Sequence, residues 1–178
     1  MALVGESGAG KSTLLSALQS QMKNKAALIP QDLGLVNNLS VFHNIYIGRL
    51  NSYSSVYNLL NLAWPQRREI GKIKPLVERL GLVENLFKPT GELSGGQQQR
   101  VAIARALVTK APIIVADEPT GDLDRDAGAE ILELLAETNR EFGRTVVMVT
   151  HDPKAAAKAK TVVHFEKGKL EVGGNSVI

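Results

Sequence analysis

The chain lacks cysteine, long apolar runs and a strong charge of either sign, and each absence excludes a class of protein. Without cysteine there is neither a disulfide nor a cysteine-ligated metal site. The longest apolar stretches, 111–116 and 146–149, are much shorter than the roughly 18 residues that cross a bilayer. The start has no basic segment followed by an apolar one, so we expect no signal peptide. We therefore expect a soluble chain that depends on partner chains for any role at a membrane.

The composition is that of one ordinary globular domain. The 178 residues are enough for one well-buried core, and 44% are hydrophobic and 22% charged, as in typical soluble domains. The net charge of +3 is small, and lysine and arginine are spread along the whole chain. Such a distribution favours a solvated surface, so we expect no nucleic-acid partner.

Apolar runs alternate with amphipathic patterns over most of the chain. They predict strands at 2–4, 26–29, 113–116 and 145–150, a last strand pair at 162–165 and 170–172, and helices from 12, from 97 and over 129–142. Gly143 is placed to end the last of these helices. This alternation implies an α/β fold with a mainly parallel sheet and right-handed crossovers.

Residues 32–92 differ in composition from the rest of the chain. They are rich in Asn, Ser and Leu, and helix-like segments are separated by glycine and proline. We interpret this segment as a mostly helical insert. The chain is then a single domain over 1–178, in which 1–31 and 98–178 form the core and 32–97 the helical subdomain.

The segment after the first strand has the spacing of a phosphate-binding loop, with Gly5, four residues, and then Gly10, Lys11 and Ser12. Glycines let backbone N–H groups point at a phosphate, and the following helix start adds positive potential. As a catalytic residue, Lys11 would stabilise the negative charge of the β/γ-phosphates, and Ser12 would ligate Mg²⁺. The alternative is a strand–turn–helix junction with chance glycine and lysine. The predicted nucleotide contacts are Gly5, Glu6, Ser7, Gly8, Ala9, Gly10, Lys11, Ser12 and Thr13.

Polar side chains follow three other predicted strands. Asp117 and Glu118 end the run 113–116, and adjacent strand positions point to opposite faces, so the two carboxylates can have different tasks. The alternative is a pair of solvated acids that start a turn. His151 follows the strand at 145–150, and the alternative is a surface or structural histidine. Gln31 follows the strand at 26–29, and the alternative is a polar loop residue.

A second helix start can also bind an anion. Ser94, Gly95 and Gly96 bring a hydroxyl and bare backbone N–H groups to the start of the helix from Gln97. The alternative is a glycine-rich turn that merely caps this helix. Asp124 is placed to cap a further helix that begins near Arg125.

These motifs, with Leu-Ser-Gly-Gly-Gln at 93–97, resemble in kind and order those of the ATP-binding cassette (ABC) ATPases over essentially the whole chain. The resemblance implies a P-loop NTPase (RecA-like) core with an inserted ABC-type α-helical subdomain. It also implies that the cofactors are ATP and Mg²⁺.

The resemblance assigns a role to each motif. Glu118 is then the general base, and His151 contacts the γ-phosphate and steadies that base. The implied Mg²⁺ ligands are Ser12, Gln31 and Asp117. Two copies form a head-to-tail dimer, in which one copy caps the ATP held by the other through Ser94, Gly95, Gly96 and Gln97. Asp124 falls in the loop that crosses the dimer interface.

The same resemblance implies partners and a location. Transmembrane permease subunits would bind the 32–92 insert, which places the chain in the cytoplasm, peripheral on the cytoplasmic face of the inner membrane. Residues 44–50 and the segment after them are similar to ATPases of phosphonate-type importers, whereas 117–124 is similar to those of lipoprotein release and macrolide export. We favour phosphonate-type import. A nucleotide-binding module with little turnover is a rival; an ABC ATPase of DNA repair or ribosomes is disfavoured by the single cassette and small charge.

The chain departs from the family at its start. Family members carry an antiparallel β subdomain before the phosphate loop, with an aromatic that stacks on adenine, and this subdomain is largely missing here. Only 19 residues separate Lys11 from Gln31. We expect weaker adenine contact and exposed sheet edges, from either a misplaced gene start or a true truncation.

Overall fold

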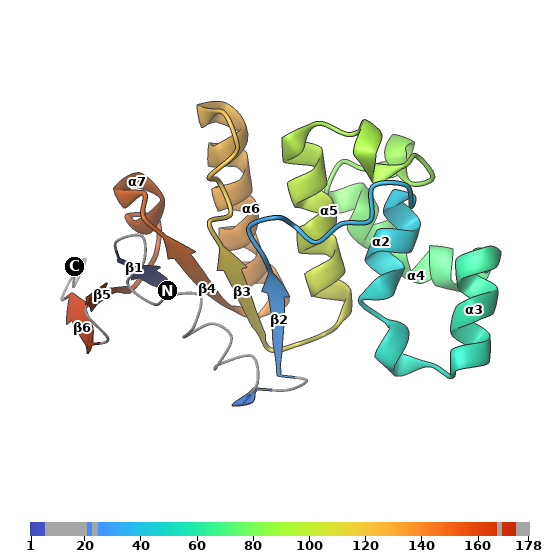
Figure 1. Cartoon of the computed structure of the whole chain (residues 1–178), viewed down its shortest axis with the longest axis horizontal. Helices are drawn as coiled ribbons and strands as arrows, with labels where there is room; N and C mark the ends of the chain where they lie inside the picture. Colours follow the sequence, from blue (N-terminus) through green and yellow to red (C-terminus); the bar gives the residue numbers. More distant parts are fainter. Residues whose placement is uncertain (6–20, 23–24, 167–168, 174–178) are drawn as a thin grey trace. The chain divides into compact units, whose positions relative to one another are not determined.

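The computed structural model describes residues 1–5, 21–22, 25–166 and 169–173 (Figure 1). The predicted helix from residue 12 lies outside this part of the chain. The fold divides into two compact units, one formed by 1–31 with 111–178 and the other by 32–110. The sequence analysis divided the chain at 31/32 and 97/98. In the structure the two units meet at 31/32 and 110/111, and the helix that starts at Gly95 packs against helices of the insert.

The first unit is built on a six-stranded sheet of order β2-β3-β4-β1-β5-β6 (Figure 1). The strands are β1 Ala2–Val4, β2 Ala26–Ile29, β3 Ile113–Asp117, β4 Thr145–Thr150, β5 Val162–Glu166 and β6 Lys169–Gly173. Neighbouring strands are parallel except β6, which is antiparallel to β5. The α/β fold with a mainly parallel sheet is confirmed.

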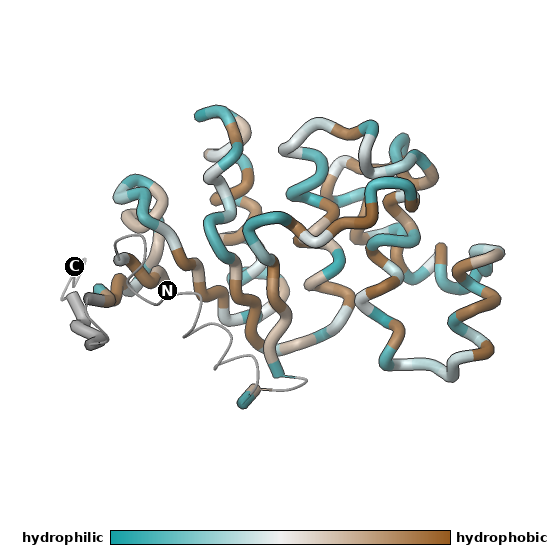
Figure 2. The backbone as a smooth tube through the Cα atoms, in the orientation of Figure 1, coloured by the Kyte–Doolittle hydropathy of each residue, from teal (hydrophilic) through white to brown (hydrophobic). Residues whose placement is uncertain are grey.

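The central strands have buried side chains on both faces, which explains why they read as apolar runs. Alternate residues of β1 point to opposite faces, so Leu3 packs with Val149 on one side while Ala2 packs with Met148 on the other. Helix α7 (Pro153–Ala156) covers the second face, together with Leu132 of α6 (Arg125–Phe142). Figure 2 shows the apolar character along β2, β3 and β4.

Local signals set both ends of α6. The Asp124 carboxylate accepts hydrogen bonds from the N–H groups of Asp126 (3.0 Å) and Ala127 (2.9 Å), so the helix begins at Arg125, as its capping role predicts. Gly143 ends the helix in the left-handed conformation, with φ of 61°. The helix predicted over 129–142 is therefore real and four residues longer at its start.

The second unit is helical, as predicted for the insert. Its elements are α2 Val41–Ile47, η1 Leu50–Ser52, α3 Ser55–Ala63, α4 Arg67–Arg79, η2 Val83–Asn85, η3 Thr90–Glu92 and α5 Gly95–Val108. Helices α2, α4 and α5 contact one another around fully buried side chains that include Phe42, Ile73 and Ile103. No helix in the described ranges combines the length and the apolarity needed to cross a bilayer.

A buried carboxylate joins three segments of this unit. Glu69 of α4 has no exposed side-chain surface and accepts hydrogen bonds from Lys72 Nζ (2.6 Å), Tyr53 OH (3.2 Å) and Tyr57 OH (3.2 Å). Arg49 Nε lies 3.4 Å from its other oxygen. Tyr57 belongs to α3, so this cluster, which we call the Glu69 cluster (Arg49, Tyr53, Tyr57, Glu69 and Lys72), attaches α3 to α4.

Candidate active site

The carboxyl ends of four parallel strands bring the predicted catalytic residues of the first unit to one edge of the sheet. Val4, which precedes Gly5, pairs in register with Thr150, and Asp117 pairs with Val149. Ile29, two residues before Gln31, pairs with Ala116. Such an edge is where ligands bind in open α/β sheets.

Gly5 is the point at which β1 enters the predicted phosphate loop. A Cβ atom added there would lie 2.4 Å from the main-chain oxygen of Phe165, so the close approach of β1 to β5 requires glycine. The remaining predicted loop residues, Glu6 to Thr13, lie outside the described residues. Their contacts with nucleotide stay a prediction.

Glu118 leaves β3 in the left-handed region, with φ of 45°, which is uncommon for a residue with a side chain. Its N–H still donates to Val149 O (2.8 Å), which continues the pairing of β3 with β4. The side chain is only 12% exposed and lies against the end of β4. Backbone strain of this kind is found at functional sites, where the surrounding structure holds it.

Three donors hold the Glu118 carboxylate. Oε1 accepts from the His151 N–H (3.1 Å) and lies 2.7 Å from His151 Nδ1. Oε2 accepts from the Thr150 hydroxyl (3.2 Å). The His151 ring is 69% exposed, so its Nε2 side can face a ligand while Nδ1 faces the base. The structure therefore brings two of the predicted catalytic residues, Glu118 and His151, into direct contact.

Thr150 is a residue of this site that the sequence analysis missed. It was interpreted only as the end of a β-branched strand, and its one signal in the sequence is its place immediately before His151. In the structure its side chain is fully buried and its hydroxyl faces the carboxylate.

Two other polar residues are predicted at this edge. Asp117 ends β3 and is half-buried, whereas Gln31 follows β2 and is exposed. Both offer oxygen atoms, the donors that Mg²⁺ prefers. Among the residues that the structure describes, no group of three or more His, Cys, Asp or Glu side chains could hold a metal.

In the second unit, Ser94 caps α5 in a reciprocal arrangement. Ser94 Oγ accepts from the N–H of Gln97 (3.4 Å), and Gln97 Oε1 accepts from the N–H of Ser94 (3.0 Å). This is a capping box, so Ser94 does cap the helix. It does not exclude an anion, because the Ser94 hydroxyl keeps its own hydrogen and the Gly95 and Gly96 N–H groups belong to the first turn of the helix.

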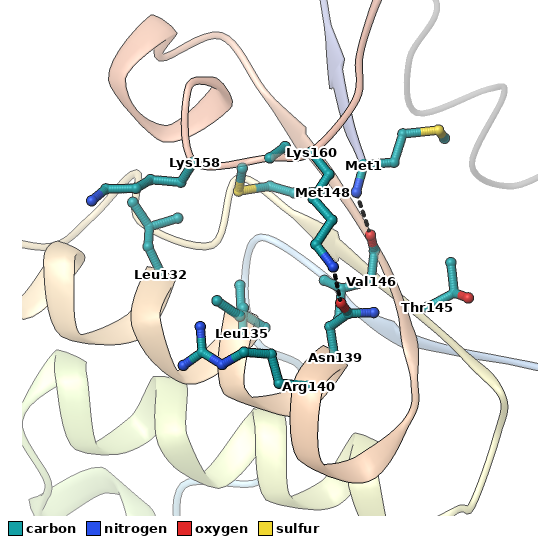
Figure 3. Close-up of a pocket in the computed structure, with 12 residues that line it drawn as sticks. Met1, Leu132, Leu135, Asn139, Arg140, Thr145, Val146, Met148, Lys158 and Lys160 are labelled. Atoms are coloured by element: carbon teal, nitrogen blue, oxygen red, sulfur yellow. Dashed lines mark hydrogen bonds between the residues drawn. The ribbon is translucent and has the colours of Figure 1, made fainter. Parts of the chain in front are cut away.

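A cavity of about 250 Å³ opens at the opposite edge of the sheet (Figure 3). It is lined by the amino ends of β1 and β4, including Met1 and Val146, and by Leu132, Leu135 and Asn139 of α6. Glu118 and His151 lie at the carboxyl ends of β3 and β4, at the other edge of the parallel strands. The cavity is therefore separate from the candidate active site.

Comparison with known proteins identifies similar sequences. The sequence profile described as ABC transporter matches residues 1–121. The macrolide export ATP-binding/permease protein MacB of Hyphomonas neptunium is 41% identical over 96% of this chain, which spans 29% of that protein. The lipoprotein-releasing system ATP-binding protein LolD of Bordetella pertussis is 38% identical over 96% of this chain and 81% of its own length. The phosphonates import ATP-binding protein PhnC 1 of a Nostoc species is 38% identical over 85% of this chain and 66% of its own length.

Solved structures show the same similarity. A bacterial ABC transporter cassette determined as a dimer superposes with a TM-score of 0.77 at 28% identity, over 96% of this chain and 84% of that one. The same cassette in a dimeric post-hydrolysis state with ADP and Pi gives a TM-score of 0.75 at 29% identity, over the same shares of the two chains.

Proposed function

The chain belongs to the ABC transporter family, and on that premise we propose that it is the ATP-hydrolysing subunit of a membrane transporter. The observation that carries this proposal is the Glu118 carboxylate, held by His151 and Thr150 at the sheet edge where β1 leads into the predicted phosphate loop. A carboxylate held in this way can accept a proton from a water molecule that attacks the γ-phosphate. His151, whose ring is largely exposed, would orient both the base and the phosphate.

The residues at this edge suit Mg²⁺ together with a nucleotide. Mg²⁺ keeps several waters and takes phosphate oxygens, so it needs few protein ligands. Asp117, Gln31 and Ser12 would hold the ion. Bound Mg²⁺ would neutralise part of the phosphate charge. Lys11 would place its ammonium group on the β/γ-phosphates.

Two copies would complete two sites. The Ser94 motif is a second helix start with free donors in a chain with one nucleotide motif, and the similar cassette was solved as a dimer. We propose that Ser94, Gly95, Gly96 and Gln97 of one copy cap the ATP bound by the other, with two-fold symmetry. Asp124, which caps α6, would lie at the same interface.

An exposed apolar surface supports binding of a permease to the 32–92 insert. Helix α3 and the residue after it expose Val56, Leu59, Leu60 and Trp64, of which Trp64 is 78% exposed. Large apolar side chains grouped on one surface mark interaction sites. With a permease on this surface, the chain would sit on the cytoplasmic face of the inner membrane.

Two classes of transported substrate are candidates. Phosphonate-type import is the one that residues 44–50 favour, and PhnC 1 is among the relatives. Lipoprotein release or macrolide export is the second candidate, because LolD and MacB align over 96% of this chain and PhnC 1 over 85%. Transport assays with a phosphonate, a macrolide and a lipoprotein would distinguish them.

The energy-coupling function is tested with Glu118→Gln, which keeps the shape of the side chain and removes the base. We expect the wild type to show Mg²⁺-dependent ATP hydrolysis and the variant to lose about 10²–10⁴-fold in kcat. With ATP the variant should elute from a sizing column as a dimer. Glu78→Gln makes the same change on the exposed surface of α4 and should leave both properties unaltered. A wild type without hydrolysis, together with a variant that stays monomeric with ATP, would refute the proposal and leave the nucleotide-binding module.

A further inference from the structure

We infer that Thr150 is a positioning residue for the catalytic base: its hydroxyl fixes the orientation of the Glu118 carboxylate. The inference rests on the proposed role of Glu118. It adds a residue to the site that is neither a nucleotide contact nor a proton acceptor, and that acts only through its contact with the base.

The polarity of the Thr150 hydroxyl is set by its surroundings. Thr150 Oγ1 accepts the N–H of Asp152 (3.0 Å) and lies 3.2 Å from Glu118 Oε2. A carboxylate oxygen can only accept, and the Asp152 N–H can only donate. The single hydroxyl hydrogen is therefore directed at Glu118. The side chain is fully buried, so it is not accessible to bulk solvent.

The residue that donates to this hydroxyl, Asp152, is itself hydrogen-bonded. The Asp152 carboxylate accepts the N–H of Lys154 (2.8 Å) and caps α7, whose Ala155 and Ala156 are buried against the sheet. Thr150 itself is held in β4 beside Val4. The hydroxyl thus connects the base to the sheet and to a helix start.

Thr150 and His151 act on different oxygens of the carboxylate. His151 engages only Oε1, through its N–H and Nδ1, and its ring is mostly in solvent. The terminal torsion of a glutamate is broad, so one restrained oxygen leaves the carboxylate plane free to turn. A second donor on Oε2 fixes that plane. Glu118 needs such support because its backbone is in the uncommon left-handed region.

A purely structural role for the hydroxyl would be to satisfy the Asp152 N–H. The two roles differ in what they affect. Loss of a structural bond weakens the fold or nucleotide binding, whereas loss of orientation at the base lowers the rate of the chemical step and leaves binding unchanged.

The test compares Thr150→Val, which keeps the shape and removes the hydroxyl, with Thr150→Ser, which keeps the hydroxyl. We expect Thr150→Val to lower kcat about tenfold, the effect of about one hydrogen bond to a charged group, with KM for Mg·ATP within about twofold. Thr150→Ser should stay within about threefold of wild-type kcat. Equal kcat in Thr150→Val and wild type, or equal losses in the two variants, would overturn the inference.

Glu118→Gln supplies the second arm of the test. If the hydroxyl acts through the carboxylate, adding Thr150→Val to Glu118→Gln should not change the residual rate further. A second tenfold loss in the double variant would overturn the inference. Should Thr150→Val fail to bind ATP, Thr150→Ala replaces it, and loss of ATP binding in both would show a structural role and likewise overturn it. These outcomes are distinct from failure of the proposed function, in which the wild type itself does not hydrolyse ATP.

Discussion

Glu69→Gln removes the charge at the centre of the Glu69 cluster, and we expect it to lower the free energy of unfolding by about 3 kcal/mol. Glutamine has the same shape, but its amide N–H₂ group would face the donors of Tyr53 and Lys72 that now reach the carboxylate. The loss also leaves the Arg49 and Lys72 cations without their counter-ion.

The expected magnitude comes from burial. Breaking a buried ion pair by removing one partner costs about 3–5 kcal/mol. The lower end applies here because the Lys72 side chain is 34% exposed and can regain water. For a chain of this size, such a loss corresponds to a fall in Tm of roughly 6–12 °C.

The pH dependence provides a second readout. Burial alone would raise the pKa of Glu69, but the Lys72 hydrogen bond and charge, the Tyr53 hydrogen bond and the Arg49 charge outweigh it and hold that pKa below its usual value. A carboxyl whose pKa is lowered by folding stabilises the fold above its unfolded pKa of about 4.3. This contribution is lost as the pH falls through the folded pKa. The difference between wild type and variant should therefore be full at neutral pH and shrink in acid.

Urea unfolding followed by circular dichroism at several pH values measures both effects. Glu133→Gln is the matched control: Glu133 also lies 2.7 Å from a cation, Arg140, but both side chains are more than half exposed, and we expect no measurable change. A Glu69→Gln variant as stable as wild type at neutral pH, or a difference that does not depend on pH, would refute the reasoning.

Three further substitutions each remove or disturb a single contact, and each has an expected effect. Gly5→Ala places a Cβ atom 2.4 Å from a main-chain oxygen of β5, and we expect a loss of about 1–3 kcal/mol in a thermal melt. Asp124→Ala removes the cap of α6 and should cost about 1 kcal/mol in urea unfolding, whereas Asp124→Asn should cost little. Arg105→Met removes donors to the carbonyls of 33–34, two residues with positive φ, and should speed amide hydrogen exchange over 32–35; unchanged exchange would contradict this.

The secondary structure of the first unit was predictable because its signals are local. Apolar runs such as 113–116 and 145–150 have no solvent-facing side, which is typical of central parallel strands, and both are strands in the structure. The start and end of α6 follow from the capping chemistry of Asp124 and Gly143. These features need no knowledge of distant residues.

The interior of the insert was not predictable in the same way. Glu69 stands in the polar stretch Arg67-Arg68-Glu69, which reads as solvated helix surface. Its burial depends on Tyr53 and Tyr57, which other segments bring to it. No pattern within α4 indicates that Glu69 has partners in other segments of the chain.

The sequence by itself determined the family, the α/β order of strands and helices, and the identity of Glu118 and His151 as candidate catalytic residues, because each depends on residue types at fixed spacing. Only the tertiary structure decided how these residues are held. The pairing of β3 with β4 sets Asp117 beside Val149, and the left-handed turn at Glu118 then brings its carboxylate to Thr150 and His151. The register between β3 and β4 is a property of the folded sheet, and it brings together Glu118 and Thr150, which are 32 residues apart in the chain. The sequence therefore signalled the hydroxyl that orients the base only by its place before His151.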